Sequence, residues 1–233
     1  MMAMLGRKFM VLAWGVIFAA LLLAVMSSFS LAQNNIDINT FSQEIQKNST
    51  QAGEMTTLLW FPEEYWQLAL SQSPNASAIQ AEEFMKVLRP YTVVAVIEGN
   101  VGTYGTVTYK TEPDIRSRIQ LVDSQGNTYS PYSDEGVNAE AKGLLAIMKM
   151  GITNSMGPKG QNMYFFFFPA QGKNGQNIAQ AKQQGFFSVK LGDREFRWEL
   201  PLNSVLPSKV CPTCKKKLSG SYKFCPWDGT KLE

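Results

Sequence analysis

The chain has no histidine among its 233 residues and only three cysteines. Without histidine it has no Ser-His-Asp or Cys-His catalytic unit, no imidazole metal ligand and no imidazole general base near neutral pH. The three cysteines all lie within the last 23 residues, at Cys211, Cys214 and Cys225. No constellation of residues therefore specifies a reaction. A non-catalytic role is favoured over an enzyme, and carboxylate or lysine chemistry stays open.

A charge excess of either sign is also missing. Lysine and arginine total 22 and aspartate and glutamate total 19, so the bulk charge predicts no polyanionic partner and no nucleic acid. The basic residues are nevertheless unevenly placed, because six lysines crowd the end of the chain at Lys209, Lys215, Lys216, Lys217, Lys223 and Lys231. Such a cluster can bind anionic surfaces. We interpret it instead as compensation for a negatively charged metal-thiolate centre nearby.

The first 32 residues read as a targeting segment. Arg7 and Lys8 precede an apolar run over residues 9–26, and Ser30-Leu31-Ala32 offers a cleavage signal. The run of 18 residues exceeds a usual signal core of about 7–15 and is just long enough to span a bilayer, which takes roughly 17–25. Cleavage after Ala32 and a retained membrane anchor both stay open. Either alternative predicts an exported protein with residues 33–233 outside the cytoplasm.

Three further segments follow along the chain. Residues 33–54 are polar and predict a tether, residues 55–205 predict the globular domain, and residues 206–233 form a separate tail. Alternation and turn residues in 55–205 predict an α+β fold, with an antiparallel sheet or sandwich and two or three packed helices. Predicted helices span 62–72, 78–88 and 138–150, and the main predicted strands span 58–61, 92–97, 106–109, 115–122, 164–168, 186–191 and 195–200. The apolar run at 164–168 predicts a central strand covered on both faces.

Two short motifs in the tail predict a metal site. Cys-Pro-Thr-Cys occupies 211–214 and Cys-Pro-Trp-Asp occupies 225–228. A turn of this kind places two ligands on one side of a single ion, so Cys211, Cys214, Cys225 and Asp228 are the predicted ligands. In the alternatives, Asp228 only caps its turn, or Cys211 and Cys214 form a disulfide in an oxidising compartment and leave Cys225 unpaired.

The same residues give the tail a family resemblance. Cys-Pro-Thr-Cys followed by Phe-Cys-Pro-Trp-Asp-Gly-Thr-Lys-Leu resembles the bacterial C-terminal zinc-ribbon module, over residues 211–232 only. The resemblance implies one structural zinc held by four ligands, in a module that serves docking or stability. The chain departs from the family at Asp228, where a fourth cysteine often stands.

Weaker signals each have an ordinary structural interpretation. A methionine cluster could bind copper, but methionine also fills core gaps. Paired glutamates could act as acid and base, but acids are common at helix starts. An aromatic group could line a groove, but it fits a core better. Gly157–Gly160 superficially resembles a phosphate loop but fits a turn. The methionine cluster is Met148, Met150, Met156 and Met163. The paired glutamates are Glu63, Glu64, Glu82 and Glu83, and the aromatic group is Trp60, Phe61, Tyr65 and Trp66.

From the sequence we therefore expect an exported, non-catalytic binding or assembly protein of the cell envelope. Its tail would hold a structural zinc, and the lysine-rich surface or the sheet would contact a protein partner. The alternative is an envelope metal-handling or thiol-redox factor that uses the cysteines for chemistry.

Overall fold

The computed structural model describes the chain except for residues 1–35, 37, 50, 52, 72–77 and 233. The predicted targeting segment and its apolar run over 9–26 lie outside the described residues. Among the helices that the structure does describe, none combines the length and apolarity needed to cross a membrane.

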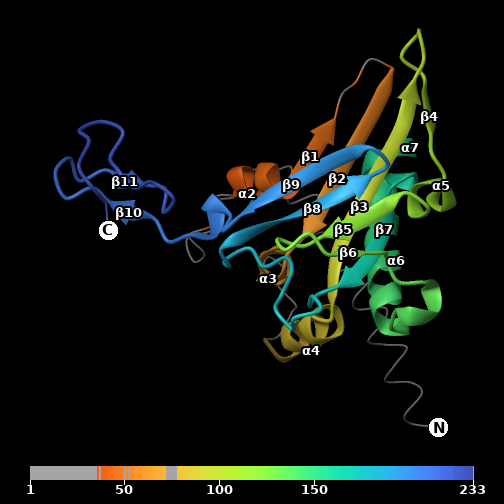
Figure 1. Cartoon of the computed structure of the whole chain (residues 1–233), viewed down its shortest axis with the longest axis horizontal. Helices are drawn as coiled ribbons and strands as arrows, with labels where there is room; N and C mark the ends of the chain where they lie inside the picture. The colour runs from red at the N-terminus through yellow and green to blue at the C-terminus, as the bar shows by residue number, and fades with distance from the viewer. Residues whose placement is uncertain (1–35, 37, 50, 52, 72–77, 233) are drawn as a thin grey trace.

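A five-stranded antiparallel sheet forms the middle of the molecule (Figure 1). Strand β3 is central, because β2 pairs along one of its edges and β4 and β7 share the other. Strand β1 continues the sheet beyond β2. The strands are β1 (Gln46–Ser49), β2 (Glu54–Phe61), β3 (Tyr91–Val101), β4 (Val107–Tyr109) and β7 (Tyr164–Pro169).

A four-stranded antiparallel sheet packs against one face of the larger sheet. Its order is β6-β5-β8-β9, from β5 (Ile119–Val122), β6 (Thr128–Tyr129), β8 (Gly185–Leu191) and β9 (Arg194–Leu200). The shared core includes Trp60, Val96, Phe187 and Trp198, and the Phe187 and Trp198 rings stack with centroids 5.0 Å apart. The alternating apolar residues of β8 and β9 thus find the covered face that their pattern predicts.

Helices cover the opposite face of the five-stranded sheet. They are α3 (Glu63–Ser71), α4 (Ala78–Leu88), α6 (Ala139–Met156) and the short α7 (Pro158–Gln161). Val93, Ala95 and Ile97 of β3 point into this second core, while Val94 and Val96 point into the first. A strand buried on both faces explains why β3 reads as a continuous apolar run. The α+β class, with antiparallel sheets and packed helices, is confirmed.

Residues 33–54 do not form the predicted tether in the part that the structure describes. They contain helix α2 (Ile38–Ile45) and strand β1. Phe41 and Ile45 of α2 are fully buried in the core between the sheets, and the Trp198 indole Nε1 donates to the Ile45 carbonyl. The polar composition of this segment led to the wrong prediction, because two apolar residues four positions apart are enough to pack one face of a short helix against the core.

Strand β7 is covered on both faces, as predicted, but it is not central. Its strand neighbour is β3, and its outer edge receives a hydrogen bond from the Tyr132 backbone N–H to the Phe167 carbonyl, at 2.8 Å. Phe166 and Phe168 lie in one core and Phe167 in the other. The continuous apolar run therefore indicated correctly that both faces of the strand are buried, but it did not indicate where the strand lies within its sheet.

Two short helices, α5 (Glu112–Arg116) and α7, were not predicted from the sequence. Residues 115–122 were expected as one strand, but α5 ends only three residues before β5 begins. The Thr111 side chain and the Asp114 carboxylate form a capping box that starts α5. The expected loop at 157–160 contains α7, which begins at Pro158 after Gly157.

A buried ion cluster joins the two sheets at the rim of their shared core. Glu98 of β3 follows Val94 and Val96 on the face toward the smaller sheet, and its side chain is buried. Its carboxylate pairs with the Arg118 guanidinium at 2.6 Å and with the Arg194 guanidinium of β9. Arg194 also donates to the Thr56 hydroxyl at 2.6 Å. The cluster links the two sheets, and removing one partner of a buried pair is costly because it leaves an uncompensated charge.

Candidate metal centre

The first turn of the tail lies between strands β10 (Lys209–Val210) and β11 (Lys217–Leu218), which pair antiparallel. The Cys211 N–H donates to the Lys216 carbonyl at 3.0 Å, and the Lys215 N–H donates to the Cys211 carbonyl at 3.0 Å. Lys215 has a φ of 59°, in the left-handed region that non-glycine residues seldom adopt outside tight turns. These bonds place the Cys211 and Cys214 side chains on the same side of the turn.

The second turn repeats the first at an offset of 14 residues, from Cys211 to Cys225. The Cys225 N–H donates to the Thr230 carbonyl at 2.7 Å, and the Gly229 N–H donates to the Cys225 carbonyl at 2.9 Å. Gly229 has a φ of 71°, at the position of Lys215 in the first turn. The two turns therefore share one backbone conformation, and Asp228 occupies the place of Cys214.

The repeat extends to the residues that flank each turn. An antiparallel bridge pairs Phe224 with Lys231, as β10 and β11 pair Val210 with Lys217. Leu218 and Leu232, also 14 residues apart, are both buried beside Cys211 and Cys225. The sequence analysis missed this internal repeat, although the 14-residue offset of Cys-Pro and of the final leucines could have revealed it.

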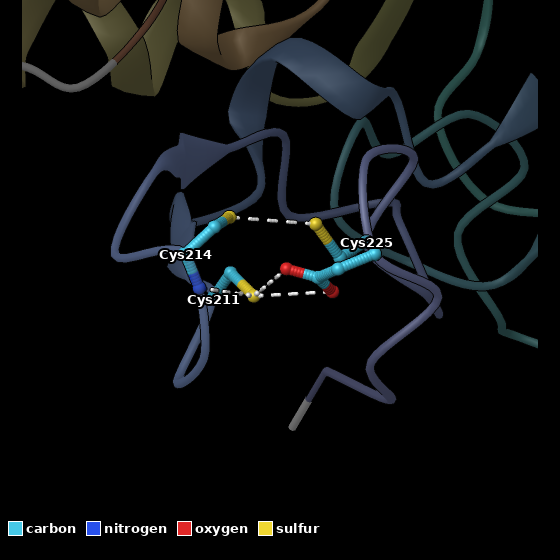
Figure 2. Close-up of side chains that lie close together, drawn as sticks. Cys211, Cys214 and Cys225 are labelled. Carbon is cyan, nitrogen blue, oxygen red and sulfur yellow. Dashed lines mark hydrogen bonds between the residues drawn. The ribbon is translucent and has the colours of Figure 1, made fainter.

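Four predicted ligands meet where the two turns face each other (Figure 2). Their ligand atoms all lie within 4.8 Å of one another. The Cys214 and Cys225 sulfurs are 3.6 Å apart, and the Cys211 sulfur lies 3.4 Å from Asp228 Oδ2. Cys211, Cys214, Cys225 and Asp228 can therefore hold a metal ion, as the sequence predicted.

Asp228 caps its turn and faces the cysteines at the same time. Its Oδ1 accepts a hydrogen bond from the Thr230 N–H at 2.9 Å, while Oδ2 points toward the Cys211 sulfur. The two interpretations of Asp228 are thus compatible, because a carboxylate has lone pairs for both contacts. The backbone bond fixes the carboxylate in the orientation that the centre needs.

The cysteines are free thiols in this structure. The separation of 3.6 Å between the Cys214 and Cys225 sulfurs is far above the disulfide bond length of about 2.05 Å. The structure brings Cys225 into the same cluster as Cys211 and Cys214, rather than leaving it as an isolated thiol.

The ionisable groups of the centre shift one another's protonation. Burial raises the pKa of the Cys211 thiol, but the Cys214 and Thr213 N–H groups outweigh it, so the pKa is lowered. The Lys216 N–H acts to lower the pKa of Cys214, yet burial and the neighbouring acidic groups raise it to about 11. Hydrogen bonds from Thr230 lower the pKa of Asp228. Without an ion, one thiol thus carries charge more readily than its neighbour.

The methionine cluster does not gather into a second site. Met148 and Met163 are buried in the core beneath the helices, and Met156 packs against that core. Met150 is exposed on the other side of α6. The burial of Met148 and Met163 fits the expectation that methionine fills gaps in the core.

The glutamates singled out in the sequence are held in ion pairs. Glu63 and Glu82 both pair with Arg89, Glu83 pairs with Lys86, and Glu64 pairs with Lys182 at 3.6 Å. Two of these glutamates thus share one guanidinium, and no free pair of carboxylates forms among the four.

The aromatic group belongs to the cores, as the simpler interpretation predicted. Trp60 and Trp66 are almost completely buried, on opposite sides of the five-stranded sheet. Phe61 stacks on Trp66 with ring centroids 5.4 Å apart. These side chains fill space between the layers, and Trp60, Phe61 and Trp66 also form part of the wall of a surface cavity beside Glu63 and Glu64.

Comparisons with known proteins identify no relative of this chain. No family model matches it, and no curated protein and no solved structure is significantly similar.

Proposed function

We propose that the chain is an exported, non-catalytic binding or assembly protein of the cell envelope whose tail, residues 206–233, is folded by one structural zinc ion. The observation that carries the proposal is the pair of equivalent turns that converge four ligands on one point. A zinc site with four protein ligands is closed, which is typical of structural rather than catalytic zinc.

Zinc fits the distances between the ligand atoms. Tetrahedral zinc with bonds of about 2.3 Å to sulfur and about 2.0 Å to oxygen separates two sulfurs by roughly 3.8 Å and a sulfur and an oxygen by roughly 3.5 Å. The corresponding distances are 3.6 Å between Cys214 and Cys225 and 3.4 Å between Cys211 and Asp228. Two of the six separations between ligand atoms therefore already match tetrahedral zinc, and all six are within 4.8 Å. When bound, zinc supplies cross-linking and no reaction.

The tail needs such an ion because its own core is very small. Its buried cluster consists of Cys211, Leu218, Cys225 and Leu232, with Cys214 packed against it. Modules below about 40 residues seldom fold on apolar burial alone, whereas structural zinc contributes roughly 10–16 kcal/mol in comparable small modules. The ligand sulfurs themselves make up half of the buried cluster.

The rest of the molecule supports binding or assembly rather than catalysis. Its candidate acid-base residues are engaged in ion pairs, which are exposed for Glu63, Glu82 and Glu83 and partly buried for Glu64. The Glu44 carboxylate of α2 accepts hydrogen bonds from the Asn203 and Ser204 N–H groups just before the tail. The tail is thus connected to the sandwich through a fixed joint, which suits a module that presents a surface.

The test is metal content and free-thiol counting on residues 33–233 purified natively from the exported compartment. We expect about one zinc per chain, with the three thiols reacting only after chelation. Asp228→Cys should retain zinc, because it restores the commoner four-cysteine set, and Asp228→Ala should bind it at least tenfold more weakly.

Two outcomes would contradict the proposal. A metal-free protein with a Cys211–Cys214 disulfide would move the thiol-redox alternative to first place. Zinc that exchanges freely under native conditions, without loosening the tail, would favour metal handling.

A further inference from the structure

The tail exposes large apolar side chains around its metal centre. Val210, Phe224 and Trp227 are 61%, 60% and 61% exposed, and Tyr222 is also exposed. These residues belong to a module of fewer than 30 residues, whereas apolar side chains of the two cores are almost fully buried. Apolar groups that gather on one small module usually mark an interaction surface.

A lysine stands beside each of the three most exposed apolar residues. The Lys216 Nζ lies 4.0 Å from the centre of the Trp227 ring. Lys217 is the cross-strand partner of Val210, and Lys231 is the bridge partner of Phe224. Directly opposed residues in antiparallel pairs project to the same side. The 14-residue repeat thus builds the same apolar-plus-lysine pair twice, and we call these six residues the lysine-apolar surface.

The charge of the tail is opposite to that of the body. Six lysines of the tail accompany only Asp228 and Glu233, whereas residues 33–205 carry 14 basic and 17 acidic side chains. The ion pairs that the structure describes all lie in the body and engage no lysine of the tail. Three thiolates and the Asp228 carboxylate around one zinc ion leave the centre with a net charge of about −2, which offsets part of the lysine charge. The remaining positive charge of the tail is available to an anionic partner.

We propose that the lysine-apolar surface binds peripherally to an anionic lipid bilayer. Aromatic side chains are favoured at the boundary between headgroups and acyl chains, and lysine stems lie along apolar neighbours while the ammonium reaches the phosphates. Alternating apolar and cationic groups match this boundary. A soluble anionic polymer would use the charge but would leave the three exposed apolar groups in water, whereas the bilayer boundary accommodates both kinds of group.

The proposal rests on the proposed function in one respect, the envelope location that brings the tail near a membrane. It also specifies the partner of that module. Figure 1 shows the tail beside the sandwich, beyond the end of β9 and away from the helical layer, so the tail can contact a flat surface before the body does.

The tryptophans of residues 33–233 provide a reporter without labelling. Trp60, Trp66 and Trp198 are at most 2% exposed, and only Trp227 among the described tryptophans is exposed. The buried residues of all three clusters lie between Phe41 and Leu232, so residues 33–233 contain every buried cluster in the part of the chain that the structure describes. Quenching by lipids brominated on their acyl chains therefore reports contact of Trp227 with the bilayer.

The experiment compares zinc-loaded protein with vesicles of phosphatidylcholine alone and of phosphatidylcholine mixed with phosphatidylglycerol, both containing brominated lipid. We expect quenching and co-sedimentation with the anionic vesicles only, weakening as salt rises. The triple variant Lys216→Gln, Lys217→Gln, Lys231→Gln should bind about a hundredfold more weakly, at roughly fivefold per lysine. The matched control Lys86→Gln, Lys142→Gln, Lys173→Gln changes three exposed body lysines and should bind like the unaltered protein.

Four results would overturn the proposal. Equal binding to neutral vesicles would remove the role of charge, and equal losses in both triple variants would remove the role of the tail. Binding to soluble polyglutamate without quenching by either vesicle would identify an acidic protein as the partner. Zinc is measured in each sample, so protein that holds zinc but ignores vesicles refutes the lipid surface alone and leaves the structural zinc standing.

Discussion

Replacing Phe41 by alanine tests whether the segment expected as a tether is part of the fold. The Phe41 ring is 1% exposed and lies in the core between the two sheets. Truncation of a buried phenylalanine costs about 3–5 kcal/mol, from lost transfer free energy and from the cavity that remains. A tether residue would cost less than about 0.5 kcal/mol. The predicted loss therefore separates the two possibilities by several-fold.

The assay is urea unfolding of residues 33–233, monitored by the fluorescence of the buried tryptophans. We expect the Phe41→Ala midpoint to fall with an unchanged slope, because the surface exposed on unfolding stays similar. Phe41→Leu keeps most of the volume and should recover all but about 1.5 kcal/mol. Tyr104→Ala, at a residue that is 96% exposed, serves as the control. A Phe41→Ala midpoint equal to that of the control would refute the docking of α2.

Two other predictions concern charges of the body. Glu98→Gln should cost about 3–5 kcal/mol, because it leaves Arg118 without its carboxylate and Arg194 with only the more exposed Glu54. Glu83→Gln, on an exposed pair, should cost under about 1 kcal/mol; equal urea midpoints would contradict the idea that the cluster joins the sheets. Burial raises the pKa of Asp123, but hydrogen bonds from Asn127 and Tyr129 outweigh it, so the folded pKa is lowered. The stability that Asp123 contributes is therefore complete above its unfolded pKa of about 3.9 and is lost as pH falls through the lower folded value. Asp123→Asn should flatten this part of the acid unfolding curve, and an unchanged curve would show that other carboxyl groups control it.

Local patterns carried most of the secondary structure. The helix predicted over 78–88 is observed as α4 (Ala78–Leu88), because a proline at residue 90 ends it and its apolar residues recur at helical spacing. The last hairpin likewise follows from alternation around the Gly192 turn. Where the signal came from neighbours in sequence, the prediction succeeded.

Long-range arrangement was the part that the sequence left open. The apolar run at 164–168 predicted a strand buried on both faces. Its place beside β3 depends on pairing with residues far away in the sequence, which the run itself does not specify. The link between Glu98 and Arg194 joins residues 96 positions apart, and no local pattern announces it. Hydrophobic periodicity indicates which residues of an element are buried, but it does not indicate which other segment covers them.

The sequence by itself identified the four residues that can hold a metal ion. Each pair of ligands is separated by two residues, so the geometry of one turn is enough to bring Cys211 to Cys214 and Cys225 to Asp228. Only the tertiary structure decided that the two turns are equivalent, that they face each other, and that Val210, Phe224 and Trp227 remain on the surface. These facts depend on how separate segments pack, because burial is a property of the assembled fold and not of a residue's own type.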